Sequence, residues 1–193
     1  SVTGVQTCAL PISYTRLRDA GFAVEPLVAP AIGDGPPTYT STLLGRRGAA
    51  LAALEHAHLA INHRPSMSGW VLPVSAGLPL ERFERITETG SHHRSLEVLL
   101  AGEADAAPID SHLLAAELPD WPELRGLPVL ADYGPSPSPP IVLVAGAAEQ
   151  ADALRAQLTA IEPIGPVDRL VAVDDAFYDS TRESDRRAAL CTR

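Results

Sequence analysis

The chain has 193 residues, of which 46% are hydrophobic, and it carries a formal net charge of −9 with a pI of about 5.0. Such an acidic chain is a poor match for nucleic acid or an anionic membrane, because clustered Lys and Arg are needed to bind phosphate groups. No stretch approaches the roughly 20 consecutive apolar residues of a membrane-spanning helix, so the composition favours one hydrophobic core or two small ones.

The first 13 residues, SVTGVQTCALPIS, carry no charge and show neither helical nor strand periodicity. Residues 2–12 resemble the in-frame translation of a common sequencing-library adapter. Residues 1–13 are therefore left out of the fold prediction and are expected to pack against nothing specific. Cys8 lies in this segment, so only Cys191 remains and no disulfide is predicted. On this interpretation the natural N-terminus, with any signal peptide, is missing.

Helical and strand patterns alternate along the rest of the chain. YTRLRDAG predicts a helix that stops at Gly21, and the apolar run HLAIN predicts a buried strand over 58–62. SHHRSLEVLLAGE has the clearest helical pattern, with Leu96, Leu99 and Leu100 on one face. The other predicted strands cover residues 22–32, 38–47, 82–89, 104–109, 127–134, 141–146 and a segment beginning at 169. The other predicted helices cover residues 48–57, 70–77, 111–121, 147–161 and the end of 169–184.

This alternation indicates an α/β fold with parallel strands joined by right-handed crossovers. Two extended segments, around Tyr39 and over PSPSPP at 135–140, flank the best strand–helix–strand block. This layout is typical of one domain inserted into another through two linkers. Residues 39–144 are predicted to form one lobe, and residues 14–38 with 145–193 belong to the other.

Three polar turns follow three of the predicted strands, at residues 66–69, 90–93 and 110–112. Each leads from the carboxyl end of a strand into the N-terminus of a helix. Ligands of open α/β sheets bind outside these strand ends, and free N–H groups at helix N-termini attract anions. The turn Ser66-Met67-Ser68-Gly69 adds two hydroxyl groups and a glycine that permits close approach of the backbone. The three turns together predict an anion site.

Each of these signals also has a purely structural interpretation. Ser91, Ser111 and Asp110 are all residue types that cap helices, and capping is the favoured reading for the two serines. His56 and His58 could form a metal pair, but no cysteine or carboxylate cluster supports one, so no metal is predicted.

The order of the segments PSMSGW, ETGSHHRSLEVLLAGEADAAPIDS and GPSPSPPIVL resembles the PhnD-like family, the phosphate, phosphite and phosphonate substrate-binding proteins of ABC transporters. The resemblance covers residues 14 to about 180. It implies the two-lobed fold of a type II periplasmic binding protein, which closes around its ligand. It also implies that the first strand and helix of lobe one are absent from this chain.

The resemblance carries ligand-binding roles over to Tyr39, Ser66, Met67, Ser68, Gly69, Ser91, His92 and Asp110. In the family, the acidic residue at the position of Asp110 can accept a hydrogen bond from a protonated oxyanion or a ligand amine. Met67 departs from the family, which has Thr or His there, and His63 and Arg64 stand where an acidic residue and Pro are common.

The function implied by this resemblance is that of an extracytoplasmic substrate-binding protein. It would bind a small phosphorus oxyanion in the cleft between its lobes, without cofactor or metal, and deliver it to an ABC transporter permease. The alternative is an enzyme on the same fold that uses Ser, His and Asp. The chain has no Gly-x-Ser-x-Gly elbow, which disfavours a hydrolase, and no helix-turn-helix, which disfavours a transcription regulator.

Overall fold

A computed structural model describes residues 11–144, 150–162 and 165–191. The chain folds into two compact units. Unit 1 comprises Ser1–Thr38 and Ser136–Glu183, and unit 2 comprises Tyr39–Pro135 and Ser184–Arg193. No described helix is both long enough and apolar enough to cross a membrane. Cys8 lies outside the described residues, and Cys191 is exposed and free.

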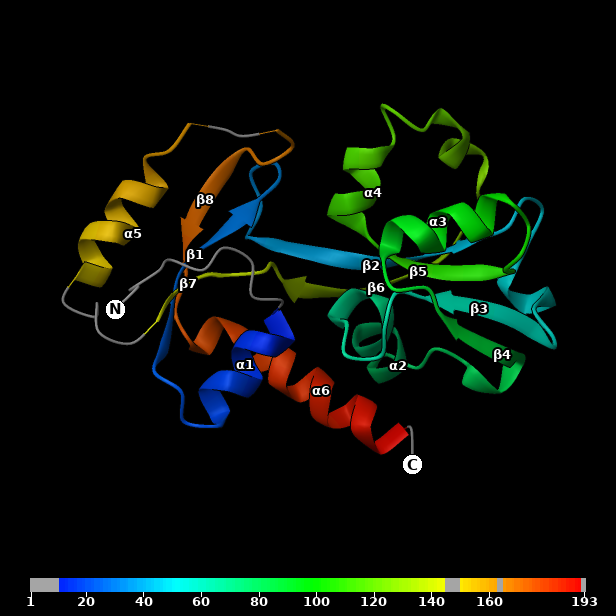
Figure 1. The fold of residues 1–193 in the computed structure, drawn as a ribbon, viewed down its shortest axis with the longest axis horizontal. Coiled ribbons are helices and arrows are strands. Elements are labelled where there is room, and N and C mark those ends of the chain that lie inside the picture. The colour runs from blue at the N-terminus through cyan, green and yellow to red at the C-terminus, as the bar shows by residue number, and fades with distance from the viewer. Residues whose placement is uncertain (1–10, 145–149, 163–164, 192–193) are drawn as a thin grey trace. The chain divides into compact units, whose positions relative to one another are not determined.

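The elements of unit 1 are α1 (Pro11–Asp19), β1 (Val24–Ala31), β7 (Ile141–Val144), α5 (Ala151–Thr159) and β8 (Arg169–Ala172). The three strands form one sheet with β1 in the centre, and both neighbours run antiparallel to it (Figure 1). α5 packs against β1 and β8, and α1 contacts β1. This sheet is therefore antiparallel, whereas the sequence analysis predicted parallel strands throughout.

α1 ends as predicted, at a glycine. Gly21 has a φ of +87°, and the N–H groups of Gly21 and Phe22 bond to the carbonyls of Arg18 and Leu17. The prediction that residues 1–13 pack against nothing specific is wrong at the start of this helix. Pro11 and Ile12 are buried in its first turn, and residues 1–10 lie outside the described part of the chain.

A network of charges ties α1 to α6 (Asp179–Cys191), which begins after the turn that holds Asp175. The guanidinium of Arg182 contacts Asp175 at 2.7 Å and Asp19 at 2.9 Å, and the hydroxyl of Tyr14 donates to Asp175. Burial opposes the ionised form of Asp175, but the hydrogen bonds from Arg182 and Tyr14 outweigh it and lower the pKa of this carboxyl.

We expect Arg182→Gln to lower the free energy of unfolding at pH 7 by about 1–2 kcal/mol, because the hydrogen bonds are charge-assisted but partly exposed. A carboxyl whose pKa is lowered by folding stabilises the protein above its ordinary pKa of about 3.9. That contribution is lost as the pH falls through the lower value of the folded state. Urea unfolding should therefore show a difference from wild type that is full at pH 7 and shrinks in acid. Arg187→Gln, at an exposed position of the same helix, is the control.

The elements that build the sheet of unit 2 and cover it are β2 (Thr38–Gly45), β3 (Ala57–Ile61), α2 (Leu72–Ser75), β4 (Phe83–Glu88), α3 (His92–Leu100), β5 (Ala106–Asp110), α4 (Ser111–Glu117) and β6 (Val129–Pro137). The strand order is β4-β3-β5-β2-β6. In Figure 1, α3 and α4 lie on one side of the sheet and α2 on the other. Leu96 and Leu99 of α3 are fully buried in the core of this unit, as their shared face predicted.

Parallel pairing is confirmed for three neighbouring strands of this sheet but not for all of it. β3 pairs in parallel with β4 and with β5, whereas β2 runs antiparallel to β5. The predicted helix over 48–57 is also wrong, since only the short 3-10 turn Leu51–Ala53 forms there. Gly48 and His56, both at positive φ, bound this segment, and so short a helix does not repay the cost of its nucleation.

The two predicted linkers lie next to each other. β2 and β6 are neighbours in the sheet of unit 2, and the N–H of Ser138 bonds to the carbonyl of Pro37 in unit 1. β6 runs into the PSPSPP segment as an edge strand, where a proline without an N–H is tolerated. The predicted lobe of 39–144 is too long, because β7 pairs with β1 in unit 1 and the division falls after Pro135.

Candidate anion-binding site

The three polar turns lie at the same end of the sheet of unit 2, where the strands β3, β4 and β5 terminate. β4 and β5 both run parallel to β3, so the carboxyl ends of all three strands point the same way. The turn after β3 is followed by η2 (Met67–Val71), a π-helical turn that continues into α2. β5 contacts η2, and the turn after β4 leads into α3. The predicted clustering of these turns is thus confirmed.

Residues 66–69, the serine turn, form the N-terminus of this helical segment. The Oγ atom of Ser66 accepts a hydrogen bond from the N–H of Gly69 at 3.0 Å, and its carbonyl accepts from Trp70 and Val71. The N–H groups of Met67 and Ser68 precede these bonds and have no intrahelical acceptor. These two backbone donors carry partial positive charge, in a turn where Met67 is 1% and Ser68 is 4% exposed.

Asn62 organises the serine turn, and the sequence analysis missed it. This side chain is only 5% exposed, and its Nδ2 donates to Ser66 Oγ at 2.9 Å and approaches His92 Nε2 at 3.1 Å. Its Oδ1 accepts from the N–H of His63 at 2.7 Å. A Cβ atom on Gly69 would lie 1.7 Å from this oxygen, so only glycine fits there. A polar residue closing the apolar run HLAIN was the signal available in the sequence.

His92 is held as a neutral ring. Its Nε2 lies 2.9 Å from Ser68 Oγ, which joins the second polar turn to the first. Burial lowers the pKa of His92 to about 4, with a further lowering by His63 and a small opposing effect of the Pro108 backbone. Nδ1 is buried and makes no well-formed hydrogen bond among the described residues. This histidine therefore contributes hydrogen bonding rather than charge at neutral pH.

Asp110 lies next to the serine turn through Ser41. Ser41 is opposite Asp110 in the β2–β5 pair, and its Oγ donates to the carbonyl of Ser68 at 2.6 Å. Asp110 Oδ1 accepts from the N–H groups of His112 and Leu113, so the predicted capping role is confirmed. Burial raises the pKa of Asp110, although these hydrogen bonds and His112 partly offset it.

The remaining predicted residues surround this group. Ser91 caps α3 by accepting from the N–H of Arg94 at 3.0 Å, as predicted. Ser111 does not cap α4, because Asp110 does so, and its Oγ accepts from the N–H of Thr40. Tyr39 is buried, with its ring 5.8 Å from that of His112.

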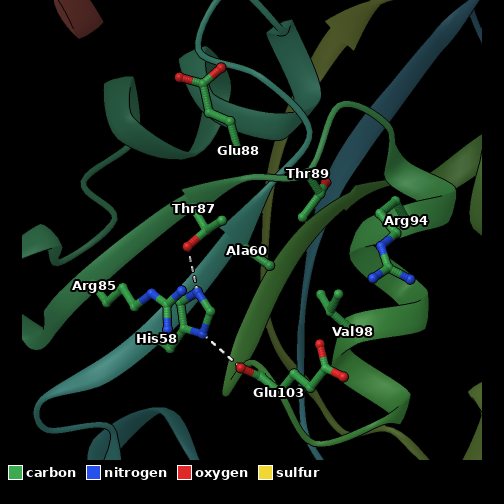
Figure 2. Close-up of a pocket in the computed structure, with 9 residues that line it drawn as sticks. All are labelled: His58, Ala60, Arg85, Thr87, Glu88, Thr89, Arg94, Val98 and Glu103. Atoms are coloured by element: carbon green, nitrogen blue, oxygen red, sulfur yellow. Dashed lines mark hydrogen bonds between the residues drawn. The ribbon is translucent and has the colours of Figure 1, made fainter.

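His56 and His58 do not form a metal pair. His58 Nδ1 lies 2.7 Å from the carbonyl of Glu103 and Nε2 lies 2.8 Å from Thr87 Oγ1 (Figure 2), while His56 is exposed beside Glu84. Within the described ranges no three His, Cys, Asp or Glu side chains gather as metal ligands. His58 lines a hollow of about 590 Å³ beside α3 that includes no residue of the serine turn.

Comparison with known proteins decides what kind of protein carries this site. Residues 8–179 match the sequence profile of the family described as ABC transporter, phosphonate, periplasmic substrate-binding protein. The chain belongs to this phosphonate-binding family. The chain is therefore the substrate-binding component of an ABC transporter, and its family supports an extracytoplasmic location. A search of curated proteins found no significant match.

Comparison with solved structures shows that this chain has the predicted fold of a type II periplasmic binding protein. It aligns with the binding-protein component of a Pseudomonas aeruginosa ABC phosphonate transporter at a TM-score of 0.79 and 17% identity, over 96% of this chain and 68% of that one. PhnD1 from Prochlorococcus marinus, in complex with methylphosphonate, aligns at 0.75 and 14% identity, over 93% and 76%. A Xanthomonas citri protein bound to ATP aligns at 0.66 and 16% identity, over 95% and 76%.

The family also decides between binding and catalysis. The family is one of periplasmic substrate-binding proteins of ABC transporters, which confirms the prediction that the chain is not an enzyme. The Ser68–His92 contact could be mistaken for a nucleophile and its base. A catalytic triad would also need a carboxylate bonded to His92, but the carboxylate of Asp110 accepts from N–H groups at the start of α4.

Proposed function

We propose that this substrate-binding protein binds a small tetrahedral phosphorus oxyanion, a phosphonate, phosphite or phosphate, at the serine turn of unit 2. The observation that carries the proposal is the serine turn itself. It combines two N–H groups without intrahelical acceptors, at Met67 and Ser68, with a hydroxyl at Ser68. Ser66 and Gly69 build the turn, and no metal or cofactor is required.

The charges around the turn favour an anion that is not fully ionised. The helix N-terminus attracts negative charge, and His92 is neutral, so it adds none of its own. Asp110 repels a bare anion but accepts a hydrogen bond from an acidic P–OH group or from a ligand amine. We therefore assign Asp110 to selection among anions and the serine turn to their binding. Tyr39 and Ser91 complete the proposed set, Tyr39 beside His112 and Ser91 at the start of α3.

The family supports phosphorus chemistry for this ligand, and PhnD1, a protein of the same fold, was solved with methylphosphonate. Methylphosphonate is therefore the first probe to use. The proposed partner of the loaded protein is the permease of a phosphonate-type ABC transporter.

Calorimetric titration of the full chain with methylphosphonate, phosphite, phosphate and sulfate tests the proposal. We expect at least one of the phosphorus anions to bind at least about tenfold more tightly than sulfate, a difference of about 1.4 kcal/mol in binding free energy. Equal and millimolar responses to all four anions would overturn the proposal.

The substitution Asp110→Asn should change the preference among anions without lowering the stability of the protein. Because burial raises the pKa of Asp110, ionisation of this carboxyl costs more in the folded protein than in the unfolded chain, and asparagine caps a helix as well as aspartate does. We therefore expect the free energy of unfolding at pH 7 to stay the same or rise. The preference for methylphosphonate over sulfate should fall by about tenfold. A variant that is destabilised but keeps its anion preference would assign Asp110 to the fold alone.

A further inference from the structure

The orientation of the Asn62 amide is determined by its backbone neighbour. The N–H of His63 can only donate, so the atom that it reaches at 2.7 Å is the amide oxygen. The amide nitrogen then faces Ser66 Oγ and His92 Nε2. Asn62 is buried, and its oxygen fills the space beside Gly69, so the group is tightly confined.

This orientation selects one tautomer of His92. Nε2 receives an N–H group from Asn62 at 3.1 Å and therefore carries no proton itself. The proton of the neutral ring then lies on Nδ1, which is buried and has no hydrogen-bond partner among the described residues. The opposite tautomer would set the Nε2–H of His92 against the Nδ2–H of Asn62, a contact between two donors.

The tautomer in turn sets the direction of the bond to Ser68. Because Nε2 has no proton, the hydroxyl of Ser68 donates across the 2.9 Å contact. The proton of this hydroxyl is then used within the protein, and its free lone pairs can only accept. The serine thus offers an acceptor, as the Asp110 carboxylate does.

We propose that Asn62 is a positioning residue that, through His92, makes Ser68 a hydrogen-bond acceptor and so selects oxyanions that still carry an acidic proton. This inference rests on the proposed function and deepens it by naming the ligand class, a monoprotonated phosphorus oxyanion. Sulfate, which has no proton at neutral pH, can donate to neither acceptor, whereas a monoprotonated oxyanion donates its proton to one of them. The nearby titratable side chains are His63, which disfavours charge on His92, and Asp110 at the end of β5.

The first test needs no ligand. The ring nitrogens of His92 are observed by long-range proton–nitrogen NMR in the wild-type chain and assigned by their loss in His92→Gln. We expect a neutral ring with the proton on Nδ1, unchanged between pH 5.5 and 8. A proton on Nε2, or a ring that titrates within this range, overturns the inference even if phosphonate binds.

The second test is Asn62→Asp, which keeps the shape of the side chain but replaces the N–H donor by an oxygen. This oxygen draws a proton to Nε2, so that Nε2 no longer accepts from the hydroxyl of Ser68, which is then free to donate to the ligand. We expect the NMR signals to report a protonated Nε2 and the preference for methylphosphonate over sulfate to fall by about tenfold or more. Arg64→Gln makes the same change in charge at an exposed side chain that does not contact His92, and should leave the tautomer and the preference unchanged.

The outcomes separate the two proposals. A changed tautomer with an unchanged anion preference overturns the role of Asn62 in selectivity. An equal loss of preference in Arg64→Gln assigns the effect to charge and overturns it as well. A wild-type chain that binds none of the phosphorus anions overturns the proposed function, and the ligand class inferred from Ser68 fails with it, whatever the state of His92.

Discussion

Gly69→Ala is expected to be the most damaging single substitution at the site, lowering the free energy of unfolding by about 2–4 kcal/mol. The added methyl group would lie 1.7 Å from Asn62 Oδ1 and 3.1 Å from Ser66 Oγ, so the Asn62 amide must move. Overpacking typically costs about 1–3 kcal/mol, and each buried polar group left without its partner adds about 1–3 kcal/mol. Urea unfolding monitored by circular dichroism measures the change.

Gly35→Ala is the matched control for this prediction. Gly35 has open space within 4 Å of its added Cβ and is not at positive φ, so the free energy of unfolding should change by less than about 1 kcal/mol. Anion binding should be lost in the Gly69 variant and kept in the Gly35 variant. Two variants of equal stability would contradict the close packing of Gly69 against Asn62.

Ser68→Ala should weaken methylphosphonate binding by roughly tenfold to a hundredfold, because a hydrogen bond to a charged group contributes about 1.5–3 kcal/mol. The free energy of unfolding should fall by only about 0.5–1.5 kcal/mol, because the hydrogen bond to His92 is lost but the carbonyl of Ser68 that accepts from Ser41 is retained. Calorimetry measures the affinity and urea unfolding measures the stability.

Ser75→Ala is the control for this substitution. Ser75 is also buried, about two helical turns further on in α2, but its hydroxyl donates to the carbonyl of Leu72 within the same helix. Its removal should leave the affinity unchanged. A loss of binding in both variants, or in neither, would remove Ser68 from the proposed site.

Much of the site could be predicted from local sequence because strand ends and helix starts are local features. The run HLAIN followed by two serines and a glycine indicates a strand, a cap and a close approach, and all three are present in the structure. The role of Asn62 could not be read in this way. It depends on contacts with Gly69, seven residues later, and with His92 on another element.

The arrangement of strands was less predictable for the same physical reason. An apolar strand such as IVLV has the same pattern whether its partner is β1 in unit 1 or a strand of unit 2, and pairing is decided by tertiary contacts. β2 likewise reads as an extended segment, and its antiparallel pairing follows from where the chain enters the sheet. The packing of Ile12 depends on the same long-range contacts.

The most direct test of the proposed function observes the backbone of the serine turn while a ligand is added. Amide NMR of the labelled chain during titration with methylphosphonate reports on the N–H groups of Met67 and Ser68, which have no intrahelical acceptor. We expect these two signals to shift until they saturate, and to shift further than the amide signals of the strands in unit 1. The same two signals should shift much less when sulfate is added. Saturable binding that leaves both signals unmoved would contradict an anion site at the serine turn.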